Sequence, residues 1–442
     1  PFPEPRRPRD FRRMKRPLLL LLLLWLVTQT MGAAEPRRLS LQDVRDQVLK
    51  SHPRISVAEL RALAARQVVI ENRAGFFPLI SANATAVGND GEANTRIAAG
   101  GLNNPSVYER AAVGASISQL ITDFGRTANL TEASKLRAQA AATNIAATRA
   151  QLLLEVDGAY FSALAARAVK TVAARTLDNR KLLLDQVSTL ASNQLKSELD
   201  VRFAQVGMDE ARLLASKAEK DWQAALAILA GLLGQRDPGD FTLQEEPAPE
   251  RPPDDAEPLI ALALRQRPEL VRLRIEREAA IASARAERGL SYPTISAFGA
   301  AGVIPEHDSH FDHEYAAAGL NLNLPLFAGG QHEARRKEAE LLSEAAGEAL
   351  HDAEISLIRE VRLAWLEAGQ ARERIRLTTS LLDSSNGALD LARARFEQGL
   401  SSIIELNQAD LNQTAAALAR ASAEYEYRTR LDLLDYQTGS LR

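Results

Sequence analysis

The sequence predicts an α+β membrane protein in which a helix–strand–strand–long-helix unit occurs twice. Three observations predict this fold class: an internal repeat, strand segments in which apolar and polar residues alternate, and helical segments of unusual length. With 442 residues, the chain can form several domains or one elongated one. We expect the long helices to pack antiparallel in a coiled-coil barrel, with the strands at one end.

The repeat is visible as matching residues in the two halves of the chain. Phe77-Pro78-Leu79-Ile80-Ser81 in the first half corresponds to Tyr292-Pro293-Thr294-Ile295-Ser296 in the second. Further matches follow in the same order: Pro53 and Pro268, Glu155 and Glu360, Asp200 and Glu405, and Gly234 and Gly439. A single gap between Ser81 and Gly125 aligns the halves throughout, which indicates a duplicated architecture.

The repeat and the local patterns divide the chain into a pre-sequence, two repeats and a linker. Residues 1–34 are the pre-sequence and signal peptide, residues 35–234 the first repeat, residues 235–256 a Pro-rich acidic linker, and residues 257–442 the second repeat. In the first repeat we expect strands near 77–88 and 111–122 and helices near 126–192 and 198–233. In the second we expect strands near 292–303 and 315–326 and helices near 331–398 and 402–436.

The N-terminal segment has the organisation of a secretory signal peptide. Met14-Lys15-Arg16 is a basic start, an apolar run follows over 18–27, and the small residues Gly32-Ala33-Ala34 offer a cleavage site. The run is short for a membrane-spanning helix. The chain contains no cysteine, which excludes disulfides, thiolate metal sites and a lipidated N-terminal cysteine. The sequence therefore predicts export by a cleaved signal peptide.

Composition and motifs argue against nucleic-acid binding and against catalysis. The formal net charge of −3 leaves no basic surplus for a nucleic acid. The sequence lacks a P-loop, an H-E-x-x-H helix and a G-x-S-x-G nucleophile motif. Gly329-Gly330 follows a predicted strand but lacks the phosphate-loop spacing, and turn chemistry explains it. We expect neither an enzyme nor a cofactor.

The predicted strands alternate in polarity with a period of two. In the segment 315–326, Leu320 and Leu322 fall on one face, whereas Asn321 and Asn323 fall on the other. One apolar and one polar face suit either a half-buried sheet or a membrane-spanning sheet. Four strands cannot close a barrel, because single-chain outer-membrane barrels need about eight. If these strands span a membrane, several chains must share one barrel.

The long helices are expected to pack side by side with other helices. The turns between them match a motif that marks the start of a helix. A helix over 126–192 would be roughly 100 Å long at 1.5 Å per residue, and its frequent alanines allow close helix approach. Ser197-Glu198-Leu199-Asp200 and Ser402-Ile403-Ile404-Glu405 both match the S-x-x-[DE] capping box. The shorter helix of each repeat should therefore restart at equivalent points.

A dense group of potential metal ligands lies between the two strands of the second repeat. His307, His310 and His313 are spaced by three residues among acidic neighbours. This pattern admits a zinc or copper site. A solvated polar surface loop explains the same residues and is the favoured interpretation, so we predict no metal site.

Taken together, these motifs resemble the TolC family of outer-membrane efflux channels. The resemblance rests on the duplicated strand–strand–helix–helix unit and on the aromatic-Pro-x-Ile-Ser run at each first strand. It also rests on Asp123-Phe124-Gly125-Arg126 and Phe327-Ala328-Gly329-Gly330 before the long helices, and on the hairpin sequence 399–412. It covers nearly all of residues 39–439.

The resemblance implies a fold and a set of partners. Three chains would build a homotrimer with a shared twelve-stranded transmembrane β-barrel in the outer-membrane lipid of a Gram-negative bacterium. Their helices would form a tapering periplasmic tunnel. The partners would be a periplasmic adaptor (membrane fusion) protein and an inner-membrane transporter of the RND, ABC or MFS type. The expected function is a passive exit duct of a tripartite efflux or type I secretion system.

The resemblance also implies a pore constriction at the periplasmic tip. Glu405 matches the family's acidic constriction residue in the second repeat, and Asp200 matches the acidic residue of the first. The position of a second acid one turn further on is Gln408, and an arginine after the hairpin glycine is replaced by Ser401. Symmetry-related carboxylates around a narrow axis repel anions and attract cations. The alternative is that Asp200 and Glu405 are only the acids of their capping boxes, although the two roles are compatible.

Two other functions remain open from the residues alone. A periplasmic coiled-coil adaptor or scaffold would explain the helices, but not four strands with an apolar face. A periplasmic enzyme has no supporting residue. The residues do not decide whether the exported substrate is a drug, a metal ion or a protein.

Overall fold

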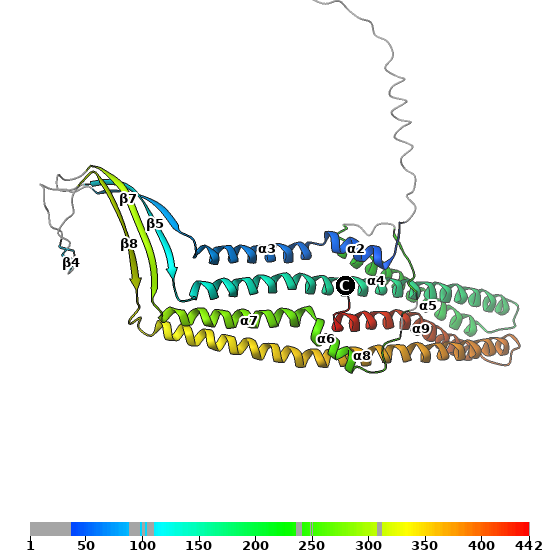
Figure 1. Ribbon diagram of the computed structural model, residues 1–442. Helices are drawn as coiled ribbons and strands as arrows, with labels where there is room; N and C mark the ends of the chain where they lie inside the picture. The colour runs from blue at the N-terminus through cyan, green and yellow to red at the C-terminus, as the bar shows by residue number, and fades with distance from the viewer. Residues whose placement is uncertain are drawn as a thin grey trace, which may run out of the picture.

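The computed structural model describes residues 37–87, 98–99, 102–103, 110–235, 241–247, 249, 251–306 and 312–441. The molecule is elongated. A curved sheet lies at one end, long helices run side by side away from it, and two helical hairpins form the opposite tip (Figure 1). The predicted signal peptide, together with His307 and His310 of the histidine group, lies outside the described residues.

Each repeat runs through the predicted order of elements. The first contains β1 (Arg37–Leu39), α2 (Leu41–Ser51), α3 (Pro53–Ala74), β2 (Leu79–Val87), β5 (Arg110–Thr122), α4 (Arg126–Ser192) and α5 (Glu198–Leu232). The short strands β3 (Ala98–Ala99) and β4 (Leu102–Asn103) pair with each other between β2 and β5.

The second repeat follows a short strand in the linker. Its elements are β6 (Phe241–Leu243), α6 (Glu257–Gln266), α7 (Pro268–Arg288), the 3-10 turn η1 (Gly289–Ser291), β7 (Thr294–Glu306), β8 (Glu314–Asn323), α8 (Gln331–Glu397) and α9 (Ile403–Thr438). The duplicated α+β class is therefore confirmed. Sequence analysis missed β1 and β6, which pair in parallel and join the linker to the start of the first repeat.

The sheet is antiparallel in the order β2-β5-β7-β8, so strands of both repeats meet at its centre. The register separates two faces. Rows such as Ile80–Ile117–Gly299–Ala318 form an apolar face, whereas rows such as Ser81–Ser116–Ala300–Ala317 and Leu120–Ser296–Asn321 form a more polar one. The predicted alternation is confirmed. Strands β2 and β8 are the two edges of the sheet within this chain.

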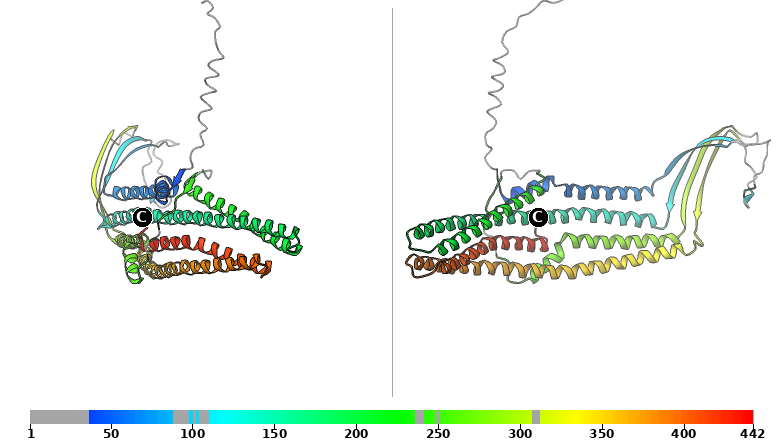
Figure 2. Two further views of the ribbon diagram at one scale, coloured as in Figure 1. Left: turned by 90° about the vertical axis from the view of Figure 1, so that its right-hand side faces the viewer. Right: turned by 180° about the vertical axis from the view of Figure 1, so that it is seen from behind.

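The helices pack as neighbours around a shallow arc. Near the sheet they lie in the order α3, α4, α7 and α8, and toward the tip α5 and α9 pack beside α4 and α8 (Figures 1 and 2). Buried alanines line these contacts and allow the close approach expected from the sequence. Three apolar clusters anchor the body: one around Tyr160, one around Val361, and one near the tip that includes Phe396 and Leu406.

Glycines set the points at which the long helices begin. Gly125 before α4 and Gly330 before α8 have φ values of 95° and 79°, in the left-handed region that favours glycine. Both lie directly between a strand and a long helix. The repeated Gly at this junction thus turns the chain from the sheet into the helical body in each repeat.

Candidate functional site

The tip of the first repeat is closed by a complete capping box. Ser197 Oγ accepts a hydrogen bond from the backbone N–H of Asp200 at 3.2 Å, and Asp200 Oδ2 accepts one from the backbone N–H of Ser197 at 3.0 Å. Asp200 Oδ2 also accepts a 2.8 Å hydrogen bond from the Ser197 hydroxyl. The Asp200 carboxylate is therefore committed to the start of α5, and the prediction of a capping box is confirmed here.

The tip of the second repeat is organised differently. Ser402 Oγ accepts a hydrogen bond from the backbone N–H of Glu405 at 3.3 Å, as predicted. The carboxylate of Glu405, however, turns to Arg395 at the end of α8, with Oε1 3.1 Å from Nε. Only half of the predicted capping box forms, because a guanidinium across the hairpin attracts the carboxylate more strongly than an exposed backbone amide. Glu405 is exposed, and its charge is partly balanced by this arginine.

Charged side chains of the first repeat contact the second repeat at the tip and deeper in the helical body. The ammonium of Lys196, in the first hairpin, lies 3.9 Å from the centre of the Phe396 ring on α8. Deeper in the body, Arg180 Nε on α4 lies 2.6 Å from Asp410 Oδ2 on α9, and Arg180 Nη1 donates to Asn407 Oδ1 at 3.0 Å. Both charged side chains are almost fully buried. The absence of a side chain at Gly207 leaves room for the guanidinium.

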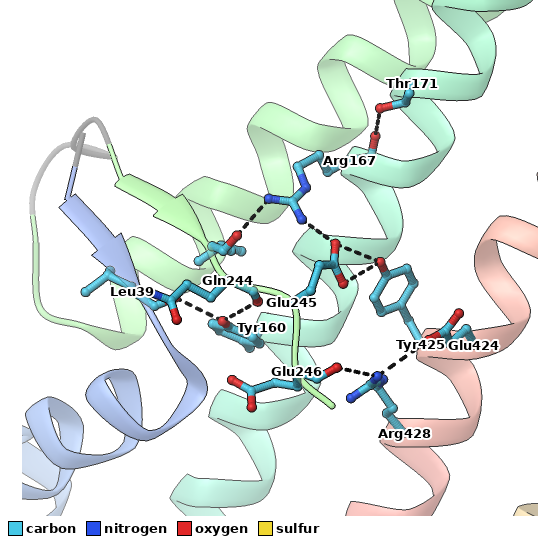
Figure 3. A network of polar contacts seen from close by, with 11 residues as sticks. Leu39, Tyr160, Arg167, Thr171, Gln244, Glu245, Glu246, Glu424, Tyr425 and Arg428 are labelled. Carbon is cyan, nitrogen blue, oxygen red and sulfur yellow. Dashed lines mark hydrogen bonds and ion pairs between the residues drawn. The ribbon is translucent and has the colours of Figure 1, made fainter. Parts of the chain in front are cut away.

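A second polar network lies where the linker crosses the helical body (Figure 3). The Tyr160 hydroxyl on α4 lies 3.0 Å from the Leu39 carbonyl oxygen of β1 and 2.8 Å from that of Gln244 after β6. From α9, the guanidinium of Arg428 donates to the carbonyls of Glu246 and Pro247 at 2.8 and 2.9 Å. The linker is thus fastened to both repeats by side chains of their long helices.

Next to this network, three carboxyl groups share one arginine. Arg45 of α2 donates to both oxygens of the fully buried Asp157 at 2.7 and 2.6 Å, and its guanidinium lies 4.0 Å from Asp432 of α9. Burial, reinforced by the charge of Asp157, raises the pKa of Asp432 to about 7. Burial also raises the pKa of Asp435 one turn away. We therefore expect Asp432 to change its protonation near neutral pH.

Sequence analysis identified the tips but missed the linker network and the carboxyl cluster. Tyr160 and Trp365 occupy matching positions of the two repeats, and the indole N–H of Trp365 donates to the carbonyl of Pro253 in the linker at 2.8 Å. An aromatic residue with a polar group at this repeated position was the available signal. No sequence pattern indicated the carboxyl cluster, because the spacing of Asp157 and Asp432 does not show that the two residues lie close together.

Among the described helices, none combines the length and apolarity needed to cross a membrane. Within the described residues, no group of three acidic, histidine or cysteine side chains is placed to hold a metal ion. Of the proposed histidine ligands, only His313 is described.

Comparison with known proteins agrees with this architecture. The sequence profile of the outer membrane efflux protein family matches residues 44–235 and 259–440, one segment in each repeat. The chain is 28% identical to outer membrane protein OprJ of Pseudomonas aeruginosa over 331 residues, covering 72% of this chain and 67% of OprJ. It is 24% identical to outer membrane protein TolC of Vibrio cholerae over 407 residues, covering 88% of each.

Solved structures of outer-membrane channels share this fold. The solved outer-membrane channel OprN superposes with a TM-score of 0.80 at 23% identity, covering 90% of each chain. The channel CusC gives the same TM-score at 19% identity, covering 90% of this chain and 92% of CusC. The profile match spans most of both repeats. The chain therefore belongs to the outer membrane efflux protein family, a family of efflux and secretion channels of the outer membrane.

Proposed function

We propose that this chain forms a homotrimeric exit duct that receives its substrate from an inner-membrane transporter through a periplasmic adaptor. The observation that supports the proposal most directly is the sheet, which has one apolar face and whose edge strands, among the described residues, are β2 and β8, each paired on one side only. An edge with free backbone groups is not tolerated in lipid. A ring in which β8 of each copy pairs with β2 of the next removes every edge.

The helical body offers edges that suit the same ring. Helix α3 lies at one side of the arc and exposes Leu60, Leu63 and Ile70, each more than half exposed. Helix α8 lies at the other side, where its sheet-proximal half exposes Leu341, Leu342 and Ile355. Apolar side chains in this number favour burial against a partner. Head-to-tail association of copies would bring the two edges together.

We further propose that the ring places Asp200 and Glu405 of every copy around a narrow periplasmic aperture. Copies of Glu405 would give a ring of carboxylates that favours cations, and its pairing with Arg395 lowers the effective charge. The Asp200 carboxylate is held in its capping box and contributes mainly to the shape of the first hairpin. The two acids thus differ in role although they occupy matching positions.

The hairpin ends are the proposed contact surface for the adaptor. Leu195 and Leu199 on the first hairpin and Leu400 and Ile404 on the second are largely exposed at the tip farthest from the sheet. Relatives carry the names of both system types, among them a toluene efflux pump outer membrane protein of Pseudomonas putida and an alkaline protease secretion protein of Pseudomonas aeruginosa. We also propose a division into repeats 35–234 and 257–442 with the linker 235–256.

The decisive test is the mass of the protein purified from membranes in detergent, measured by light scattering with the detergent contribution subtracted. We expect three protomers. Leu63→Glu on α3 and Leu342→Glu on α8 should each shift the protein toward monomer, since each buries a charge in the proposed contact. Lys217→Glu on α5, where the lysine pairs within its own helix, is the matched control. A soluble monomer or dimer that needs no detergent would contradict the duct and favour the adaptor or scaffold alternative.

A further inference from the structure

Two aromatic side chains on the polar face of the sheet lie against glycines of neighbouring strands. Tyr315 on β8 is the cross-strand partner of Gly302 on β7, which in turn is opposite Gly114 on β5. A Cβ atom placed on Gly114 would lie 2.1 Å from the Tyr315 hydroxyl oxygen, and one placed on Gly302 would lie 2.6 Å from it. The tyrosine therefore lies across β7 and reaches β5, along the sheet surface.

Phe298 on β7 shows the same arrangement in the opposite direction. Its cross-strand partner on β8 is Gly319, and a Cβ atom there would lie 2.9 Å from two atoms of the phenyl ring. The rows of Tyr315 and Phe298 lie four residues apart in the register, which is roughly 14 Å along the strands. Each copy of the chain in the ring would thus carry two aromatic groups at two heights.

The open sides of these rings remain accessible. Tyr315 is 40% exposed and Phe298 is 44% exposed, although both rings pack against the sheet. In the rows from Asn83–Gly114–Gly302–Tyr315 to Leu120–Ser296–Asn321, the described residues on the same face are uncharged, among them Ser116, Ser118, Ala300 and Ala317. With no charged side chain among the described residues of these rows, the electron-rich ring faces are the features of this part of the surface best able to attract a cation or stack with an aromatic solute.

We propose that Tyr315 and Phe298 form two weak binding sites for aromatic organic cations on the inner wall of the duct. The inference rests on the proposed function, in which the apolar face meets lipid and the polar face meets the water-filled lumen. A flat, immobilised ring loses little conformational freedom when a solute stacks on it. Such sites would slow aromatic cations without closing the passage.

The test is single-channel recording in planar bilayers, with phenyltrimethylammonium as the probe in a potassium chloride background. The unchanged protein should show concentration-dependent reduction of current by the probe. Tyr315→Leu and Phe298→Leu keep an apolar side chain over the glycine but remove the aromatic face. Each should raise the half-blocking concentration about two- to fivefold, the size of a cation–π contact at an exposed site. Tyr315→Phe should retain the block.

Ile117 provides the matched control. It packs over Gly299, whose Cβ position lies 3.1 Å from the isoleucine, but it does so on the apolar face. Ile117→Ala should leave the block unchanged. An unchanged half-blocking concentration in both leucine variants would overturn the aromatic sites while the channel itself still conducts. A protein without any conductance would instead contradict the duct on which the inference rests.

Discussion

At the scale of single residues, the most consequential group is Asp432, because its pKa of about 7 lies far above the ordinary value of 3.8. The folded protein holds a proton there that the unfolded chain releases. The stabilisation is full below the unfolded pKa and is lost as the pH rises through the folded one. Between pH 5 and pH 8, we expect the free energy of unfolding to fall as the pH rises. At the lower end of that range this group should contribute up to about 1.4 kcal/mol per pH unit, and thermal unfolding measures the change.

Asp432→Asn should flatten this decline, since an amide stays neutral at every pH. Its matched control is Asp221→Asn on α5, whose carboxylate pairs with Lys217 on the protein surface. The control should keep the pH dependence of the unchanged protein. An equal slope in Asp432→Asn would show that Asp157 or Asp435, which face the same arginine, holds the proton instead.

The buried ion pair between Arg180 and Asp410 is a second residue-scale case. Arg180→Ala should destabilise the protein by about 3–5 kcal/mol, because it leaves a carboxylate buried without its partner. Chemical unfolding measures this loss. The comparison is Arg376→Ala, whose exposed pair with Glu373 lies within one helix, so its loss should change stability far less than the loss of the buried pair. Adding Asp410→Asn to Arg180→Ala should recover part of the loss, and no recovery would argue against direct coupling.

At the scale of elements, the linker contacts long helices of both repeats and holds them together. Tyr160→Phe removes the hydroxyl that meets the carbonyls of Leu39 and Gln244, and should cost about 1–3 kcal/mol, since buried carbonyls lose a partner. Limited proteolysis should cut the linker sooner in this variant. Tyr436→Phe on the same helix α9 is the control, because its hydroxyl donates to Glu269 of α7 and not to the linker. Equal cleavage rates in both variants would remove Tyr160 from this role.

The same scale shows what the sequence could predict. Periodicity and the repeat predicted the order of strands and long helices correctly. Each of these elements can be recognised from the pattern of its own residues and from the matching segment in the other repeat. They were not enough for β1 and β6, which are three residues each and pair across about 200 residues of chain. The prediction of a complete capping box at Ser402 was wrong in one half for the same reason. The deciding residue, Arg395, lies on the other side of the hairpin, and a local motif does not include it.

At the scale of the whole molecule, a single side chain can set the ion selectivity of the proposed aperture, because every copy of the chain contributes it. In the proposed ring each copy contributes Glu405, so Glu405→Gln removes one carboxylate from every copy at once. The potassium-to-chloride permeability ratio, obtained from reversal potentials in planar bilayers, should fall toward unity. Arg395→Gln should act in the opposite direction, because it frees the carboxylate from its partner guanidinium at 3.1 Å.

Asp200→Asn separates selectivity from hairpin structure. Its oxygen accepts hydrogen bonds from the backbone and hydroxyl of Ser197, so the substitution should lower stability by about 1 kcal/mol with a smaller change in selectivity than Glu405→Gln. If Asp200→Asn shifts the permeability ratio as much as Glu405→Gln, both acids line the aperture and the capping box is secondary. If neither shifts it, the narrowest point lies elsewhere along the tunnel. Because the two acids occupy matching positions in the two repeats, this comparison measures how far the duplicated halves have diverged in function.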